Sequence, residues 1–414
     1  MMKVKDSGVS YIGNIPISWY TKKIKYVAVE CSESGLMNPK ESQYIGLENI
    51  VGYSNRIIIT DTEYELSIQK RCYKDNILFG KLRPYLSKVV IAPYDGFCTG
   101  EFLELTKYKG DIRFLRYSLL NANLIDTINM STYGAKMPRA NSEFIMNCCI
   151  AYPTYNEQKI ISDFLDTKCE EIEALSMDIQ AEIDTLEEYK RSVIIEKVTK
   201  GLNPDVVMKD SSIGWIPKVP SHWNVSKFKY HLKRQTIKNH GDATVLSLYR
   251  EFGVIPKDSR EDNHNVTSED TSKYLYVKKG DFVINKMKAW QGSVAVSNYN
   301  GIVSPAYYVY EFSDESIYKD YFHYLMRNRM YAIEFRRLSG GIREGQWDLS
   351  AVSLENIWIL IPPYNEQVAI AEYLNKTTKE IEEIINRKKE QLAVLEEYKK
   401  TIIYEYVTGK KVHA

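Results

Sequence analysis

Two short clusters of the chain interleave basic side chains with an aromatic ring. The first cluster holds Lys81, Arg83, Tyr85 and Lys88 within eight residues. Ammonium and guanidinium groups pair with phosphates and donate to guanine edges, and aromatic rings stack on bases. This cluster therefore has the chemistry of a nucleic-acid contact. The alternative is a solvated strand with one buried aromatic residue.

The second cluster holds Lys286, Lys288, Trp290 and Gln291. The side-chain amide of glutamine matches the donor and acceptor of an adenine edge. The cluster occupies the place equivalent to the first in a repeat of the chain, with Trp290 opposite Tyr85 at an offset of 205. Its recurrence favours a binding surface over two unrelated strands.

Two glycine-containing loops add further polar and basic groups. Residues 133–139 contain Lys136 and Arg139, and residues 339–347 contain Arg343 and Gln346. Glycine allows the backbone to approach a ligand closely. We predict that each loop extends one of the two surfaces, and a simple turn is the alternative.

No motif of a catalytic centre accompanies these residues. The element Pro362-Pro363-Tyr364 is similar to one that holds the target amine in adenine methyltransferases, but the apolar Ile361 stands where a polar residue would be needed. The six histidines lack the spacing of metal ligands, and the HExxH, GxxxxGK[ST] and GxSxG motifs are not found. We therefore expect no catalytic residue, no metal site and no cofactor bound by this chain.

The elements that position the clusters are repeated along the sequence. Residues 6–19 return as residues 210–223 at an offset of 204, with Asp, Ser, Ile, Pro and Trp in the same order. Residues 153–199 return without a gap as residues 362–408 at an offset of 209. The two middles differ from each other. This pattern indicates one shared task for the similar segments and two different tasks for the middles.

The segments after residues 153 and 362 are typical of long helices. Residues 155–200 lack Gly and Pro, and Gly201 and Pro204 provide a stop signal. Apolar residues recur every seven positions in both copies, with a polar interruption at Lys388. The predicted coiled-coil core consists of Leu165, Ile172, Ile179, Leu186, Val193, Leu374, Ile381, Leu395 and Ile402.

Each helix of about 45 residues would span roughly 65 Å and cannot bury its apolar stripe alone. We expect the two helices to pair as an antiparallel coiled coil with a pseudo-twofold axis. We also expect a second seam of Leu175, Ile183 and Tyr189 on the first helix, supported on the second helix by Ile384, Ile385, Leu392 and Tyr398. The alternative is that each helix packs on its own globular domain.

The middles, residues 20–150 and 224–358, mix short β-branched runs with helical patterns, which predicts an α+β fold for each. Each middle carries a net charge of +3, whereas residues 155–200 carry −6. The near-neutral charge of the whole chain, +1, is therefore an average over unlike parts. A net charge of +3 by itself is weak support for a nucleic-acid contact.

The composition is that of an ordinary globular protein. With 414 residues, 44% hydrophobic and 26% charged, the chain is neither disordered nor collagen-like. It has no apolar run long enough for a membrane helix, no apolar signal core at the N-terminus and no CxxC pair among six cysteines. We expect a reduced, cytoplasmic protein that does not bind membranes.

Two divergent middles that alternate with two similar helices, each helix beginning Pro-x-Tyr-Asn-Glu-Gln, resemble the specificity subunit of type I restriction–modification systems. The Asp-Ser…Ile-Pro…Trp motifs at 6–19 and 210–223 and the Leu-Glu-Glu-Tyr-Lys segments at 186–190 and 395–399 belong to the same pattern. The resemblance covers nearly the whole chain.

The resemblance implies an α+β fold with two homologous target-recognition domains separated by the antiparallel coiled coil. Its expected boundaries are 1–152 for the first recognition domain, 153–203 for the first helix, 204–361 for the second domain and 362–414 for the second helix. Each domain would read one half of a bipartite double-stranded DNA target. The helices would set the gap between the halves and dock two methyltransferase subunits.

The resemblance also implies that this chain is not an enzyme. Methylation of adenine N6 with S-adenosylmethionine, and cleavage with ATP and magnesium, would belong to the methyltransferase and restriction (motor nuclease) subunits. The competing hypothesis is a non-catalytic coiled-coil scaffold with two protein- or ligand-binding domains. Duplex binding that weakens steeply with salt distinguishes the first hypothesis from the second.

Overall fold

The structure is a computed structural model. It describes residues 3–38, 42–58, 66–134, 136–238, 240, 242–260, 270–313, 315–341 and 347–411. The chain divides into two compact units, and each contains one middle together with part of both long helices. The first unit comprises Met1–Ala181 and Lys389–Ala414, and the second comprises Glu182–Lys388.

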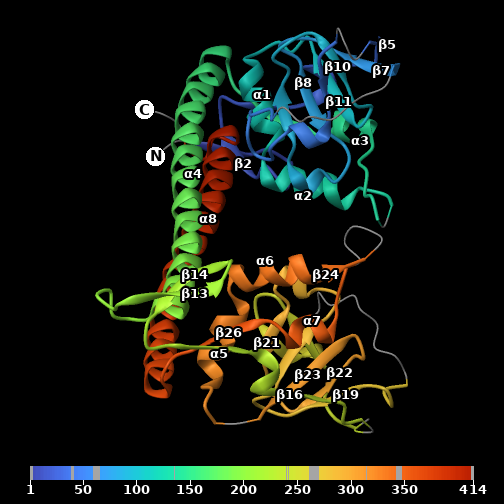
Figure 1. The fold of residues 1–414 in the computed structure, drawn as a ribbon. Helices are drawn as coiled ribbons and strands as arrows, with labels where there is room; N and C mark the ends of the chain where they lie inside the picture. Colours follow the sequence, from blue (N-terminus) through green and yellow to red (C-terminus); the bar gives the residue numbers. More distant parts are fainter. Residues whose placement is uncertain are drawn as a thin grey trace. The chain divides into compact units, whose positions relative to one another are not determined.

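The first unit is built on two four-stranded sheets and two strand pairs (Figure 1). One sheet is antiparallel and has the order β4 (Val29–Cys31), β11 (Phe102–Thr106), β8 (Ile77–Gly80), β9 (Val89–Ile91). The other has the order β5 (Ser34–Met37), β7 (Ser67–Cys72), β10 (Gly96–Cys98), β6 (Tyr44–Ile45). The strand pairs are β1 (Val4–Asp6) with β2 (Asn14–Pro16), and β3 (Tyr20–Lys23) with β12 (Cys149–Tyr152).

The described residues of this unit also form the short helices α1 (Ile112–Leu119), α2 (Ala122–Met130) and α3 (Ser142–Asn147). Each begins at an Asp or Asn side chain that accepts a hydrogen bond from a backbone N–H of the first turn, as N-cap residues do. The α1 helix packs on β8 and β9. One apolar core joins these elements to Leu165 of the first long helix and Ile403 of the second.

The second unit repeats the antiparallel sheet of the first. Its order is β16 (Leu232–Gln235), β23 (Tyr307–Phe312), β20 (Phe282–Asn285), β21 (Val294–Val296). The strand pairs are β13 (Met208–Ile213) with β14 (Ile216–Pro220), β15 (Asn224–Lys227) with β26 (Trp358–Ile361), β17 (Leu246–Tyr249) with β18 (Gly253–Pro256), β19 (Leu275–Val277) with β22 (Gly301–Val303), and β24 (Ser339–Gly340) with β25 (Asp348–Leu349). The short helices are α5 (Lys319–Arg327), α6 (Arg329–Leu338) and α7 (Ala351–Glu355).

The two long helices are α4 (Tyr155–Lys200) and α8 (Tyr364–Val407). At the start of α4, Thr154 and Glu157 bond reciprocally as a capping box, with the Thr154 N–H donating to Glu157 Oε2 at 2.8 Å. After the last turn, Gly201 adopts φ +79°, a conformation that glycine reaches without a steric penalty. Start and stop signals in the sequence therefore determine the helix ends.

The long helices pair antiparallel within each unit. In the second unit Lys190 of α4 pairs with Glu382 of α8 at 3.2 Å, and Glu182 pairs with Lys388. In the first unit Glu173 pairs with Lys399 at 2.6 Å. The partner number falls on α8 as the number rises on α4, so the predicted antiparallel coiled coil is confirmed. Lys388, the polar residue that interrupts the apolar seam, therefore forms an ion pair with the carboxylate of Glu182.

The residues expected in the two seams of the coiled coil differ in how far they are buried. Seven of the nine expected core residues are buried, and Leu186 and Leu395 are half-buried. The second seam is wrong at four positions and right at the others. Ile183 and Ile385 are buried and Leu392 is half-buried, whereas 37% to 53% of the side chain is exposed at Leu175, Tyr189, Ile384 and Tyr398. The reason is that one face of each helix also packs on its own middle, so both alternatives for the helices apply at once.

An equivalent tryptophan joins each middle to the long helices. Trp19 is buried, and its indole N–H donates to Glu157 Oε1 at 3.1 Å. Trp223 is likewise buried, and its ring lies against Gly201. The repeated tryptophan therefore serves packing.

Candidate nucleic-acid interface

Lys81 lies where three segments of the first unit meet. Its N–H donates to Glu101 O at 2.9 Å, and its carbonyl accepts from Ala140 N–H at 3.0 Å. Two residues further along the chain, a second backbone bond reaches the same loop, because Arg83 N–H donates to Pro138 O at 2.7 Å. These bonds bring the first cluster and the loop at residues 133–139 together.

Lys286 lies at the equivalent junction of the second unit. Its N–H donates to Ala306 O at 3.2 Å, and its carbonyl accepts from Leu349 N–H at 3.0 Å. Lys286 Nζ also pairs with Asp348 at 3.3 Å. The same pair of backbone bonds therefore forms around a lysine in both units.

A short 3₁₀ helix follows each of these lysines and rests on an α-helix. In the first unit η3 (Pro84–Leu86) packs on α2, and in the second η6 (Ala289–Gln291) packs on α6. Each turn ends in a left-handed residue, Ser87 at φ +51° and Gly292 at φ +83°. The α-helix therefore fixes the position of each cluster.

The side chains of the first surface fall into two groups. Arg83, Tyr85 and Lys136 are exposed. By contrast, Lys88 Nζ donates to Leu47 O at 2.6 Å, and Arg139, although it is also exposed, pairs with Glu101. The exposed group can reach a ligand directly, whereas the other two cations also hold the fold together.

The second surface shows the same division. Lys288 and Gln291 are exposed. Trp290 is half-buried: its indole N–H donates to Met287 O at 3.1 Å, and its ring packs edge-on against Trp347 at 5.4 Å. Trp290 is therefore an anchor of the cluster. Arg343 and Gln346 lie outside the described residues.

Both cations and carboxylates lie near Lys81. Burial lowers the pKa of Lys81, and the charges of Lys70 and Arg139 lower it further, while Glu101 and Glu30 oppose the shift. Lys70 lies on β7, and its Nζ donates to Phe102 O at 3.1 Å. Lys70 and Lys81 are therefore close enough for their charges to interact.

Two basic residues of these surfaces escaped the sequence reasoning. Lys70 is eleven residues before Lys81 and belongs to another strand. Arg336 of α6 lies over the ring of Trp347, 5.5 Å from the centroid. No spacing signal in the sequence links either residue to its cluster, because strand pairing and helix packing bring them there.

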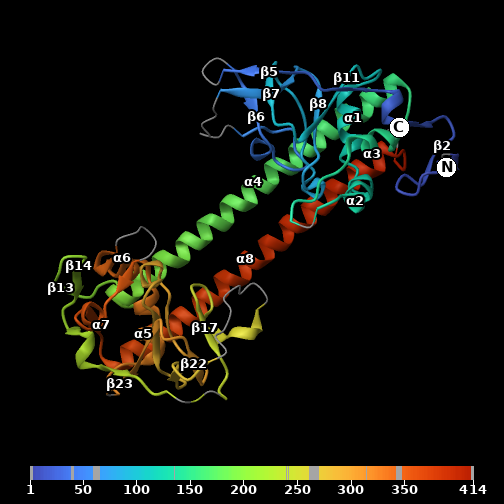
Figure 2. The same ribbon diagram turned by 90° about the vertical axis from the view of Figure 1, so that its right-hand side faces the viewer.

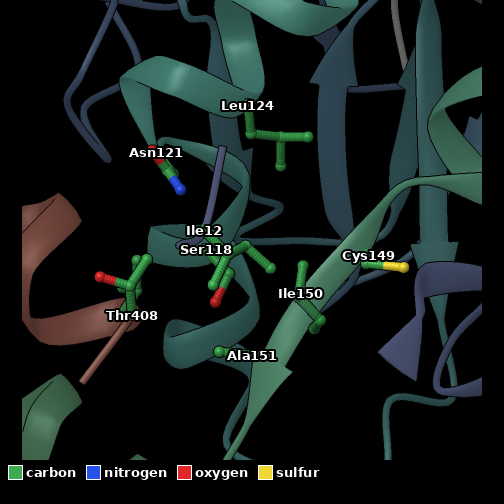
Figure 3. A pocket seen from close by; sticks show the side chains of 9 residues that line it. Ile12, Ser118, Asn121, Leu124, Cys149, Ile150, Ala151 and Thr408 are labelled. Carbon is green, nitrogen blue, oxygen red and sulfur yellow. The ribbon is translucent and has the colours of Figure 1, made fainter. Parts of the chain in front are cut away.

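A small hollow in the first unit is lined by the end of α1, the start of α2, strand β12 and the residues after α8 (Figure 3). Ser118 and Thr408 face it, and Ser118 Oγ is buried without a hydrogen-bond partner among the described residues. Within the described ranges, no group of three His, Cys, Asp or Glu residues could hold a metal ion. None of the residues that line the hollow belongs to the surface around Lys81.

Among the residues that the structure describes, no helix combines the length and the hydropathy that a membrane span requires.

Known proteins match both halves of the chain. The family described as "Type I restriction modification DNA specificity domain" matches residues 16–185 and 221–394. The MjaVIII specificity subunit of a type I restriction enzyme from Methanocaldococcus jannaschii is 26% identical over 303 residues, covering 68% of this chain and 67% of the relative. The putative MjaX specificity subunit of the same organism is 25% identical over 430 residues, covering 96% and 95%.

Solved structures share the fold over the whole chain. A chain from a study of complex assembly and conformational transition of the type I R-M system matches with a TM-score of 0.69 at 15% identity, covering 96% of this chain and 99% of that chain. The HsdS subunit of Thermoanaerobacter tengcongensis matches with a TM-score of 0.50 at 16% identity, covering 96% and 98%. The family match covers most of both halves, so this chain belongs to the family of type I restriction–modification DNA specificity proteins.

Proposed function

We propose that the chain is the sequence-specific DNA-recognition subunit of a type I restriction–modification complex, and that each unit reads one half of a bipartite duplex through the surface around Lys81 or Lys286. The observation that carries this proposal is the equivalent junction in both units. Exposed cations and polar groups stand beside each junction, where phosphates and base edges can reach them.

Within this proposal the residues have different tasks. Arg83, Tyr85 and Lys136 contact the first half-site, and Lys288 and Gln291 contact the second. Lys88 and Trp290 position their clusters, because their polar atoms are bonded to backbone carbonyls. The recognition domains extend over residues 1–152 and 204–361.

The long helices hold the two recognition domains at a set gap and dock two methyltransferase subunits. The partly exposed apolar side chains of the coiled coil support such docking, since Leu175 and Tyr398 are 49% and 51% exposed. Restriction subunits join the same assembly. Adenine methylation with S-adenosylmethionine, and cleavage with ATP and magnesium, belong to these partners, and this chain is not itself an enzyme. The complex works in the cytoplasm.

The test uses the full chain together with its methyltransferase partner. The triple variant Lys286→Ala/Lys288→Ala/Gln291→Ala is compared with the matched variant Lys81→Ala/Arg83→Ala/Lys136→Ala, and methylated adenines are located by sequencing. Each variant should weaken or alter recognition of one half-site only, and a different half-site for each. Equal changes in both half-sites, or unchanged recognition by both variants, would contradict the assignment.

Salt dependence provides a second readout. Affinity for the duplex should fall steeply between about 50 and 200 mM salt, because phosphate contacts release counterions. Binding that does not respond to salt would support the scaffold alternative.

A further inference from the structure

Strands β5 and β7 of the first unit form a ribbon with an uncovered apolar pair. Leu36 and Ile68 face each other directly in the antiparallel register, and they are 64% and 76% exposed. Leu66, at the foot of β7, is 64% exposed. Contiguous exposed apolar side chains on a folded surface usually mark a place where something binds.

The ribbon extends beyond the sheet to which it belongs. Strand β10 pairs only with Lys70–Cys72 of β7, whereas β5 pairs with Ser67–Lys70. From Ser67 to Gln69, β7 therefore has β5 as its one paired strand among the described residues. Figures 1 and 2 both show β5 and β7 at the periphery of their unit.

The ribbon is continuous with the cationic surface around Lys81. Lys70 and Ile68 lie two residues apart on one face of β7, and Lys70 is close enough to Lys81 to influence its ionisation. The guanidinium of Arg71 is exposed and lies 5.4 Å from the centre of the Phe97 ring. Of the nearby carboxylates, Glu33 is bonded by Tyr73 OH at 2.6 Å and Glu101 by Arg139, and Glu30 is also close enough to act on the ionisation of Lys81.

The second unit has a backbone hydrogen bond at the position that corresponds to the start of this ribbon. Tyr276 N–H donates to Ile237 O at 2.8 Å, and Arg71 N–H donates to Glu33 O at the same distance. In the first unit the pairing then continues through four residue pairs of β5 and β7.

We infer that the β5–β7 ribbon enters the major groove of the first half-site, with Leu36 and Ile68 against the 5-methyl groups of thymines. This inference rests on the proposed function. The major groove, about 12 Å wide, admits a two-stranded ribbon, and thymine is the base that presents a methyl group there. Lys70 and Arg71 match the phosphates that border the groove, so duplex DNA fits the charge of the surroundings.

The experiment uses the full chain with its methyltransferase partner and a pool of duplexes randomised in both half-sites. The variant is Leu36→Thr/Ile68→Thr, because threonine is β-branched and suited to strands. The variant should lose a thymine preference at one or more positions of the first half-site and keep the second half-site unchanged. Val4→Thr, an exposed apolar strand position of the same unit, is the matched control and should select as the unchanged chain does.

A DNA-side substitution makes the test independent of protein folding. In the selected first half-site, thymines are replaced singly by deoxyuridine, which lacks only the methyl group. The unchanged chain should lose affinity several-fold at one or more positions, and the double variant should lose nothing further there. Equal losses in both proteins, or no loss in the unchanged chain, would overturn the inference.

Two other outcomes distinguish a failure of the inference about the ribbon from a failure of the proposed function. A double variant that selects the same sequences but alters self-association or partner binding would show that the ribbon covers protein, which overturns the inference alone. An unchanged chain that selects no sequence at all would overturn the proposed function together with the inference.

Discussion

The side-chain carbonyl of Gln158 accepts a hydrogen bond from the backbone N–H of Asp111 at 3.1 Å. Asp111 is the N-cap of α1, so this bond fastens the first turn of α4 to the start of a helix of the recognition fold. Gln367 repeats the arrangement at 2.8 Å with the N–H of Tyr318, the N-cap of α5. The repeated glutamine therefore has a docking role in both units.

Replacing Gln158 by Ala should destabilise the first unit. Gln158 is buried, and its loss would leave the Asp111 N–H without a partner, which costs about 1–3 kcal/mol. Urea unfolding of the full chain measures the change in the free energy of unfolding. The exposed Gln391→Ala is the control and should change it by less than about 0.5 kcal/mol. Equal effects of both variants would contradict the docking role.

Replacing Gly409 by Ala should destabilise the first unit more than replacing Gly8 by Ala. Both glycines have positive φ, +68° and +70°, so alanine is strained by a similar amount at either place. At Gly409 the added Cβ would also lie 2.4 Å from Pro16 Cδ, whereas at Gly8 it meets nothing within 4 Å. Thermal unfolding of the two variants separates the contact from the conformational strain. A melting temperature as high for the Gly409 variant as for the Gly8 variant would argue against tight packing there.

The ion pair between Glu173 and Lys399 should stabilise the coiled coil. The side chains are 24% and 9% exposed, and Glu173 also accepts from Ser54 Oγ at 3.1 Å. A double-mutant cycle with alanine at both positions should give a coupling energy of roughly 1.5 kcal/mol, as for hydrogen bonds to charged groups.

The matched control for this cycle is the pair Lys168–Glu171, with 39% and 58% exposed side chains. Exposed pairs of this kind contribute about 0.5 kcal/mol or less. Similar coupling energies in the two cycles would show that burial does not strengthen the Glu173–Lys399 pair.

The stability of the second unit should depend on pH through His323. Burial, and then the charge of Arg327, lowers the pKa of His323 from 6.5 to about 3. The Arg327 guanidinium lies 3.0 Å from Nε2, so an imidazolium would face another cation. Below about pH 6.5 the histidine is protonated in the unfolded chain but stays neutral in the folded chain. The free energy of unfolding therefore falls as the pH falls towards 3, and this group does not affect it above pH 6.5.

Chemical unfolding at pH 7, 6 and 5 tests this dependence. The unchanged chain should lose up to about 1.4 kcal/mol per pH unit through this group. His323→Asn carries no titratable group there, so its free energy of unfolding should fall less over the same interval. Parallel pH profiles for the two proteins would exclude His323 as the source.

The sequence was sufficient for those features that depend on local or periodic patterns. The duplication, the bounds of α4 and the antiparallel pairing follow from repeated motifs, from Gly201 as a stop signal and from apolar residues every seven positions. A helix without Gly or Pro has few competing conformations, and two equivalent stripes can bury each other, so these predictions are confirmed.

Tertiary packing decided which side chains are available at each surface. The seven-residue pattern could not show that Leu175 and Tyr398 remain exposed, because the middles cover another face of the helices. Spacing could not place Lys70 beside Lys81, since strand pairing sets that distance. Nor could it reveal the uncovered pair of Leu36 and Ile68, because the protrusion of a ribbon depends on where the neighbouring strand β10 ends. A sequence specifies its own periodicity, whereas contacts between distant segments exist only once the chain has packed.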